Sequence, residues 1–182
     1  GVEVLAKKGA FKGRGDSLLT IRDRRNVILD GYGATLRMRK DDYLNQKGYR
    51  QGWRHALSIR GGTDIAVRGL TLAKAGADGL YLGTTGDQRY VKNVLIRDVV
   101  CENNTRQGLS VISAENLLVE NCVFRDTSGR NPGAGIDLEP NHANERMVNV
   151  TIRDSLFENN RLGMHQWFGS LGPESEPVSV LW

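Results

Sequence analysis

The chain is poor in the residues that mark several common classes of protein. Its 182 residues include two cysteines, three histidines and four prolines, and no apolar run approaches the roughly 18 residues of a transmembrane helix. Two cysteines cannot build a disulfide framework, and no CxxC pair or His/Cys cluster predicts a zinc site. The first fifteen residues lack the apolar segment of a signal peptide. Membrane insertion is therefore not expected, whereas export is left open.

The basic residues are mostly arginine, with 18 Arg against 7 Lys and a net charge of +4. Such an excess gives weight to an anionic partner: nucleic acid, an anionic membrane or an acidic polysaccharide. No basic run exceeds two residues, and Trp and Tyr do not alternate with Arg as they do in base-stacking proteins. Nucleic acid is therefore not expected, and a mildly basic surface without such a partner is the alternative.

What the sequence does contain is a repeat. Its first module has an Asn or Asp, alternating aliphatic residues, a polar pair and a second apolar pair. It recurs at residues 64–75, 93–104, 116–127 and 149–160, and residues 26–33 fit its first half. A second module carries Gly79, Gly108, Gly135 and Gly163, at intervals of 29, 27 and 28 residues. Both modules alternate with the period of two that is typical of strands. Short strands at such regular intervals predict the rungs of a parallel solenoid.

Rungs stacked in register should place equivalent residues in columns about 4.8 Å apart. We expect one column of side-chain amides and carboxylates that hydrogen-bond along the stack, and two interior columns of apolar residues. The two cysteines fall in interior columns, which predicts buried free thiols. The amide column is Asn26, Asp64, Asn93, Asn116 and Asn149, and the interior columns are Leu29, Val67, Ile96, Val119 and Ile152, then Leu72, Cys101, Phe124 and Phe157.

This pattern resembles the right-handed parallel β-helix of the pectate lyase-like superfamily, which includes pectate lyases, polygalacturonases and phage tailspikes. The resemblance covers residues 18–168 and implies an all-β, single-stranded right-handed parallel β-helix of five to six rungs. It implies a single domain over residues 1–182, cut from a longer solenoid or complete, and suggests a secreted or periplasmic protein. The same fold carries lyases, hydrolases, epimerases and non-catalytic fibres, so the function has to come from the site.

The stretch around Asp137 and Glu139 is the first candidate site. Ile136 and Leu138 should face the core, so the two carboxylates are expected to share one solvent face. Aligned modules place His165 one rung from Asp137 and Trp167 one rung from Glu139. Two carboxylates can divide the roles of acid and base, with His165 tuning one of them. The alternative is a solvated strand with an ordinary ion pair between Asp137 and His165.

Loop lengths point to the same face. Long links at residues 83–92 and 140–148 flank the rung of Ser110, which predicts a groove with Tyr81 on one side and Asp137 on the other. We expect Tyr81, Ser110 and Trp167 to contact saccharide there. The loop at residues 39–55 contains three aromatic residues and either walls the site or caps the side of the coil. His55 and His142 are expected to be solvated loop residues.

Asp78 and Arg60 are further candidates. Asp78-Gly79 is similar to the Asp-Gly of polygalacturonases, where that Asp is catalytic, but Gln107-Gly108 replaces the family's Asp-Asp pair. The Gly-His-Gly and Arg-x-Lys motifs are also missing, so we favour a turn residue at Asp78. Lyases of the superfamily use calcium and an Arg or Lys base. Asp137 and Glu139 have the oxygen ligands that calcium prefers, but Arg60 lies three rungs from Glu139, and Arg130, Arg146 and Arg161 match no motif.

The sequence thus predicts a carbohydrate-active enzyme that cleaves a polysaccharide, with an acidic one favoured by the arginine excess. Hydrolysis is preferred to calcium-dependent lysis because a carboxylate pair is visible and a lyase base is not. The rival class is a non-catalytic saccharide-binding or structural β-helix segment. Exposed strands at the coil ends, including residues 178–182, also predict a homo-oligomer.

Overall fold

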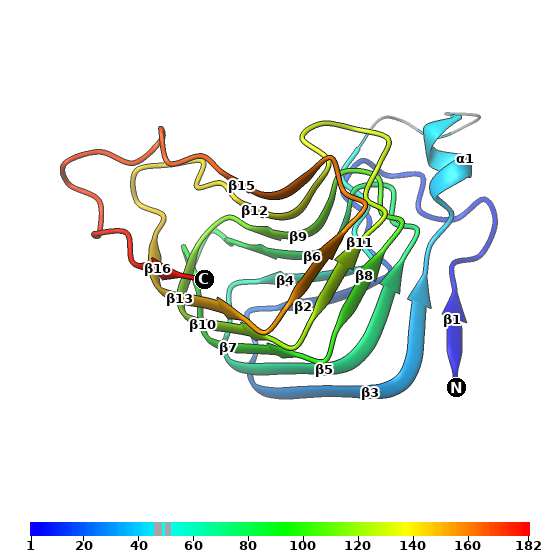
Figure 1. Cartoon of the computed structure of the whole chain (residues 1–182), viewed down its shortest axis with the longest axis horizontal. Helices are drawn as coiled ribbons and strands as arrows, with labels where there is room; N and C mark the ends of the chain where they lie inside the picture. The colour runs from blue at the N-terminus through cyan, green and yellow to red at the C-terminus, as the bar shows by residue number, and fades with distance from the viewer. Residues whose placement is uncertain (46–48, 50–51) are drawn as a thin grey trace.

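The computed structural model of the chain describes residues 1–45, 49 and 52–182 and shows a parallel β-helix (Figure 1). Every strand pair in the described residues is parallel. The predicted all-β, single-stranded parallel coil is therefore confirmed. Six strands, one for each rung, form the smaller sheet; in sheet order they are β15 (Leu162–Gln166), β12 (Ala134–Leu138), β9 (Gln107–Val111), β6 (Asp78–Gly83), β4 (Leu57–Arg60) and β2 (Leu19–Arg22).

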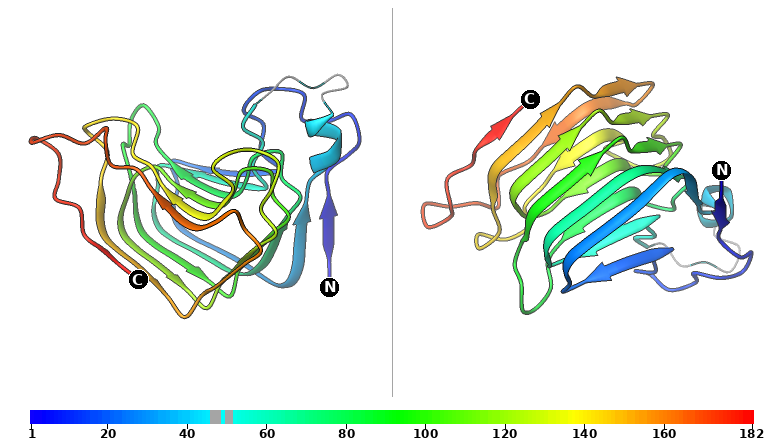
Figure 2. Two further views of the ribbon diagram at one scale, coloured as in Figure 1. Left: turned by 45° about the horizontal axis from the view of Figure 1, so that its top comes forward. Right: turned by 90° about the horizontal axis from the view of Figure 1, so that it is seen from below.

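The larger sheet has ten strands and bends around one corner of the coil, as the view from below in Figure 2 shows. Its long first strands continue through that corner, whereas the later rungs divide into two short strands there. The strands are β1 (Glu3–Leu5), β3 (Arg25–Arg37), β5 (Thr63–Ala73), β7 (Val91–Arg97), β8 (Val100–Glu102), β10 (Ala114–Glu120), β11 (Val123–Arg125), β13 (Met147–Arg153), β14 (Leu156–Glu158) and β16 (Val180–Leu181).

Left-handed residues hold one corner of each rung. Asn93, Asn116 and Asn149 have φ between 52° and 57°, a conformation that Asn and Asp tolerate better than other side chains. Their side-chain amides also form the predicted ladder: Asn93 donates to Asp64 at 2.8 Å, and Asn116 and Asn149 each donate to the residue one rung back at 2.9 Å. The amide ladder read from the sequence is therefore confirmed from Asp64 to Asn149, and Asn26 shares the left-handed conformation with a φ of 55°.

The interior columns are confirmed by the strand registers. Val67 pairs with Ile96, and Ile96 with Val119, while Cys101 and Phe124 pair in the other column. Both cysteines are buried free thiols, as expected.

The spacing of the glycines has a steric cause. A Cβ at Gly108 would lie 2.5 Å from the carbonyl oxygen of Gly135, and one at Gly135 would lie 2.7 Å from that of Gly163. Only glycine allows the rungs to stack at this position.

The one α-helix in the described residues is α1 (Lys40–Leu44), which lies beside the coil next to the N-terminal segment (Figure 1). No helix in the described part of the chain has the length and apolar character needed to cross a membrane. At the other end, Val180 of β16 pairs with Val150 of β13, so residues 178–182 do begin another strand on the larger sheet.

Candidate functional site

The predicted column of outward residues is present on the smaller sheet. Tyr81 of β6, Ser110 of β9, Asp137 of β12 and His165 of β15 follow one another in register. The Nδ1 atom of His165 lies 2.8 Å from Oδ1 of Asp137, so these residues do pair across one rung. Glu139 follows β12 and continues the ladder, because its backbone N–H donates to the neighbouring rung at 3.0 Å.

Asp137 does not face solvent, and that expectation is wrong. Its side chain is fully buried, and Nε2 of Gln107 donates to Oδ2 at 2.5 Å. Burial raises the pKa of Asp137 to about 6; the Glu139 carboxylate acts in the same direction, and His165 and Arg106 oppose the rise. Asp137 is therefore a desolvated acid, covered by polar side chains from its own and neighbouring rungs.

Arg106 joins three carboxylates and was not predicted from the sequence. Its guanidinium lies 2.9 Å from Glu139, 3.5 Å from Asp137 and 3.6 Å from Asp78. Alignment of the modules could have placed Arg106 in the turn before β9, beside the candidate column. Only the reach of its long side chain decides which carboxylates it contacts. The sequence therefore gave no sign that Arg106 would be the centre of the cluster.

The interpretation of Asp78 as a turn residue is wrong. Asp78 is the first residue of β6 and is fully buried, with Gln107 as its register partner on β9. The dipeptide Asp-Gly is typical of turns, but here Gly79 serves close packing: a Cβ on it would lie 2.8 Å from the carbonyl oxygen of Gly108. The glycine that suggested a turn is thus explained by rung stacking.

His55 is also buried, contrary to the expected solvated loop residue. Its Nδ1 lies 3.2 Å from Oδ2 of Asp78. Burial by itself raises the pKa of Asp78, but contacts with His55, Arg106 and Ser110 outweigh it, and the net shift is downward. Two Asp–His pairs therefore flank Arg106, and the pKa values of their carboxyl groups move in opposite directions.

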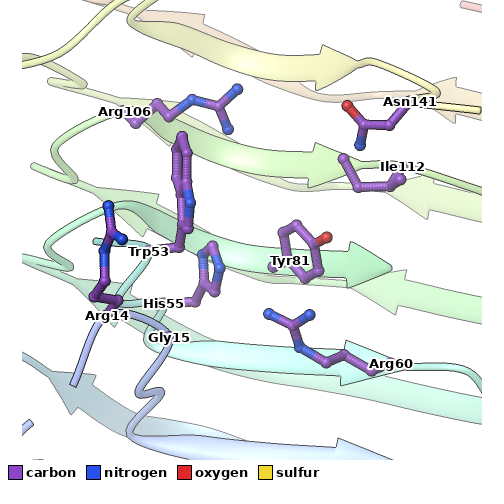
Figure 3. Close-up of a pocket in the computed structure, with 9 residues that line it drawn as sticks. All are labelled: Arg14, Gly15, Trp53, His55, Arg60, Tyr81, Arg106, Ile112 and Asn141. Carbon is purple, nitrogen blue, oxygen red and sulfur yellow. The ribbon is translucent and has the colours of Figure 1, made fainter. Parts of the chain in front are cut away.

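A pocket of about 700 Å³ opens above this cluster (Figure 3). The ring of Tyr81 stacks on that of His55, with centroids 4.5 Å apart, and the Arg60 guanidinium lies 4.6 Å from the Tyr81 centroid. Nδ1 of His55 faces the Asp78 carboxylate, whereas its Nε2 is buried without a hydrogen-bond partner among the described residues. The lining residues are Arg14, Gly15, Trp53, His55, Arg60, Tyr81, Arg106, Ile112 and Asn141.

The 39–55 loop both caps the coil and walls the site. Tyr43 and Tyr49 are buried, with ring centroids 5.1 Å apart, and the Arg54 guanidinium lies over both rings. Trp53 stands at the edge of the pocket, where the Arg106 guanidinium lies 4.9 Å from its ring centroid. Tyr43 and Tyr49 therefore cap the coil, and Trp53 walls the pocket.

The other predicted binding residues are placed less centrally. Ser110 is buried beneath the pocket and does not line it, and Trp167 continues the ladder after β15 with an exposed ring outside the pocket. The two long loops do not stay apart: the Arg146 guanidinium of the second lies 4.1 Å from the Tyr90 ring of the first. Asn141 is the residue that the second loop contributes to the pocket.

The carboxylates do not form a calcium site as they stand. Asp137 and Glu139 lie within 3.5 Å and 2.9 Å of the same nitrogen of Arg106, so a cation between them would have to displace the guanidinium. Among residues 1–45, 49 and 52–182, no three His, Cys, Asp or Glu side chains are grouped to hold a metal ion. The donor set therefore does not fit calcium in this arrangement.

Two curated relatives match the chain at low identity. Uncharacterized protein YclG of Bacillus subtilis (strain 168) is 23% identical in an alignment 160 residues long, which covers 80% of this chain and 27% of that protein. SPbeta prophage-derived uncharacterized protein YorA of the same organism is 25% identical in an alignment 124 residues long, which covers 61% of this chain and 21% of that protein. The chain thus spans about a quarter of the length of these relatives.

No solved structure matches the chain significantly. The family described as right handed beta helix region matches residues 50–175, which is more than half of the chain. This match agrees with the parallel sheets and the stacked amide ladder of the structure. The chain belongs to the right-handed β-helix family.

Proposed function

We propose that this protein binds and cleaves an acidic polysaccharide on the face formed by β6, β9 and β12. The observation that carries the proposal is the pocket lined by Trp53, Tyr81, Arg60 and Arg106 above a buried acid cluster. Aromatic rings stack on sugar rings, and arginine forks pair with carboxylates or sulfates. A sugar that carries an acid group therefore fits this lining better than a neutral one.

Hydrolysis is the reaction that we favour. His165 and Glu139 are the partly exposed members of the cluster, with side chains 32% and 29% exposed, whereas Asp137 is buried behind them. In the proposed step, the imidazolium of His165 gives its proton to the leaving glycosidic oxygen. Glu139 takes a proton from the water whose oxygen bonds to the anomeric carbon. Asp137 orients His165 and stabilises its charge.

Strand geometry supports this division of roles. Glu139 lies two residues along the strand and one rung across from His165, so their Cα atoms are about 8 Å apart. From this spacing, side-chain rotation can place the two reacting groups far enough apart for the attacking water. The proposal keeps Asp137, Glu139 and His165 as the catalytic group, with Asp137 acting through His165 instead of touching the substrate.

The stacked His55 and Tyr81 favour β-elimination as a second candidate. One of them would remove the proton on the carbon next to the uronate carboxylate. The bond between the adjacent carbon and the glycosidic oxygen would then break to form a double bond, and the other residue would give that oxygen a proton. Arg60 and Arg106 would stabilise the negative charge that builds up on the carboxylate. This route uses the buried Asp78 to hold His55, and it needs no calcium.

A panel of polysaccharides with two readouts tests the proposal. Polygalacturonate, alginate, hyaluronate and chondroitin sulfate are compared with neutral xylan and cellulose, and both new reducing ends and ultraviolet absorbance of an unsaturated uronate are followed. Reducing ends without the absorbance would support hydrolysis, and both together would support elimination. Binding without either signal would instead identify a saccharide-binding module, and no binding to any acidic polymer would contradict the proposal.

A matched pair of variants shows whether the pocket is responsible. Arg60→Gln removes a charge from the pocket, whereas Arg125→Gln removes one from β11, outside the pocket, where Arg125 pairs with Glu102 of β8. Binding of the acidic polymer should weaken only in the first variant.

A further inference from the structure

Three neighbouring pockets share lining residues and extend away from the acid cluster. The 700 Å³ pocket shares Arg14 and Trp53 with a second pocket of about 440 Å³. That second pocket shares Arg130 and Asn131 with a third of about 630 Å³, which Arg161 also lines. Each of the three pockets is therefore lined by arginine. Arg14, Arg130 and Arg161 lie on the turns that precede β2, β12 and β15.

Arg130 lines both the second and the third of these pockets. No carboxylate of the described residues forms a salt bridge with it. Its Nη1 donates to the carbonyl oxygen of Gly52 at 3.3 Å, but its Nη2 is buried without a hydrogen-bond partner. A buried donor on a charged group is costly unless a ligand satisfies it. Arg106, by contrast, contacts three carboxylates.

Trp53 stands between the two arginines. The guanidinium carbons of Arg106 and Arg130 lie 4.9 Å and 4.7 Å from its ring centroid. Gly52 lets the backbone approach closely, since a Cβ there would lie 2.2 Å from the carbonyl oxygen of Arg14. The backbone N–H of Trp53 donates to that same oxygen at 2.5 Å, which anchors the main chain at this residue. The indole lines both the first pocket and the second.

We propose that Arg130, Trp53 and Asn131 form a separate anion-binding subsite, which takes a second acid group of the same polysaccharide chain. The inference rests on the proposed function and deepens it. The preferred substrate is a chain with several charged sugars, and its affinity increases once it is long enough to reach past Trp53. A single charged sugar fills only the pocket at Arg60 and Tyr81.

Binding of oligogalacturonates of one to six units tests the subsite. Trp167 and Trp182 are exposed and are first replaced by Phe, so that Trp53 alone reports binding by fluorescence. Affinity should rise with chain length, and Arg130→Gln should remove at least about tenfold of that gain while leaving the monomer unaffected. Arg125→Gln, which loses the same charge outside the three pockets, should behave as the parent does, and far-UV circular dichroism checks that both variants fold.

The outcomes separate the two proposals. If Arg130→Gln matches the parent at every length while Arg60→Gln weakens all lengths, the subsite is refuted and the proposed function stands. Methyl-esterified oligomers that bind as tightly as the acids would also overturn the subsite, because it would then not recognise charge. A lack of any increase with length would overturn it too, while the polysaccharide panel decides the proposed function independently.

Discussion

The two sheets of the coil carry their polar residues in different ways. On the larger sheet, Glu120 of β10 is buried, but its partners Arg97 and Arg153 reach solvent, with side chains 44% and 57% exposed. On the smaller sheet, Asp78 and Asp137 are fully buried beneath side chains from neighbouring rungs. Exposed ion pairs contribute little to stability, whereas buried charges are costly unless every partner is in place. The smaller sheet is therefore where chemistry is expected.

The largest expected difference between the sheets concerns cleavage. Asp137→Asn keeps an acceptor for Gln107 but presents an uncharged amide to Nδ1 of His165, so the imidazolium loses the carboxylate that stabilises its charge. We expect the cleavage rate to fall about 10³- to 10⁴-fold, with an unchanged circular dichroism spectrum. Asp126→Asn is the matched control in the turn after β11 of the larger sheet, because Asn can still accept the hydrogen bond from Asn159. Equal activity in the two variants would remove Asp137 from the site.

The second largest difference between the sheets is expected in the stability of variants that lose an arginine. Arg106→Gln leaves Asp78, Asp137 and Glu139 without their shared cation, and loss of one partner of a buried pair costs about 3–5 kcal/mol. Arg153→Gln removes an exposed cation from the larger sheet and should barely move the midpoint of urea denaturation. If both variants unfold at the same urea concentration, the carboxylate cluster does not depend on Arg106.

The pH dependence of stability should reveal the raised pKa of Asp137. Because that pKa is about 6 in the folded chain against an ordinary 3.8, the native state keeps a proton that the unfolded chain releases. The free energy of unfolding should therefore fall as pH rises from about 4 to about 6, by up to about 3 kcal/mol. Urea denaturation across this range should show the fall in the parent protein and not in Asp137→Asn.

The pair of Asp78 and His55 predicts a pH effect on stability of the opposite sign, in a more acidic range. The pKa of Asp78 is lowered, so its contribution to stability is present above pH 3.8 and is lost as the pH falls below that value. Asp78→Asn should therefore flatten only the acid limb of the stability curve. A loss of the fall between about pH 4 and 6 in this variant would mean that the two pairs titrate together.

The amide ladder of the larger sheet should give the smallest effect. Asn116→Ala loses two ladder hydrogen bonds and forces Ala to a φ of 57°, which together should cost about 1–3 kcal/mol. Asn116→Gly loses the same bonds without the backbone strain, so it should be the more stable variant in thermal melts. If Gly is no better than Ala, the ladder bonds alone hold this corner.

The sequence predicted the regular part of the molecule well, because a repeated rung is a local pattern. The period of two fixed which side chains enter the core, and the spacing of the modules fixed the pairing of Asp137 with His165. The errors lie in what covers the strands, as at Asp78 and Asp137, and where the chain leaves the repeat, as at His55. His55 and Trp53 come from an irregular loop, and nothing in their local sequence shows that they fold onto the pocket.

The sequence by itself determined the coil, its registers, its amide ladder and its buried thiols, since stacking repeats the same local geometry at every rung. Only the tertiary structure decided that Asp78 and Asp137 are buried and that Arg106 connects them. It also decided that Trp53 lines two of the pockets. The reason is physical: burial and ion pairing depend on side chains that arrive from other rungs and loops. The alternation of residues along a strand does not show which of these side chains will cover it.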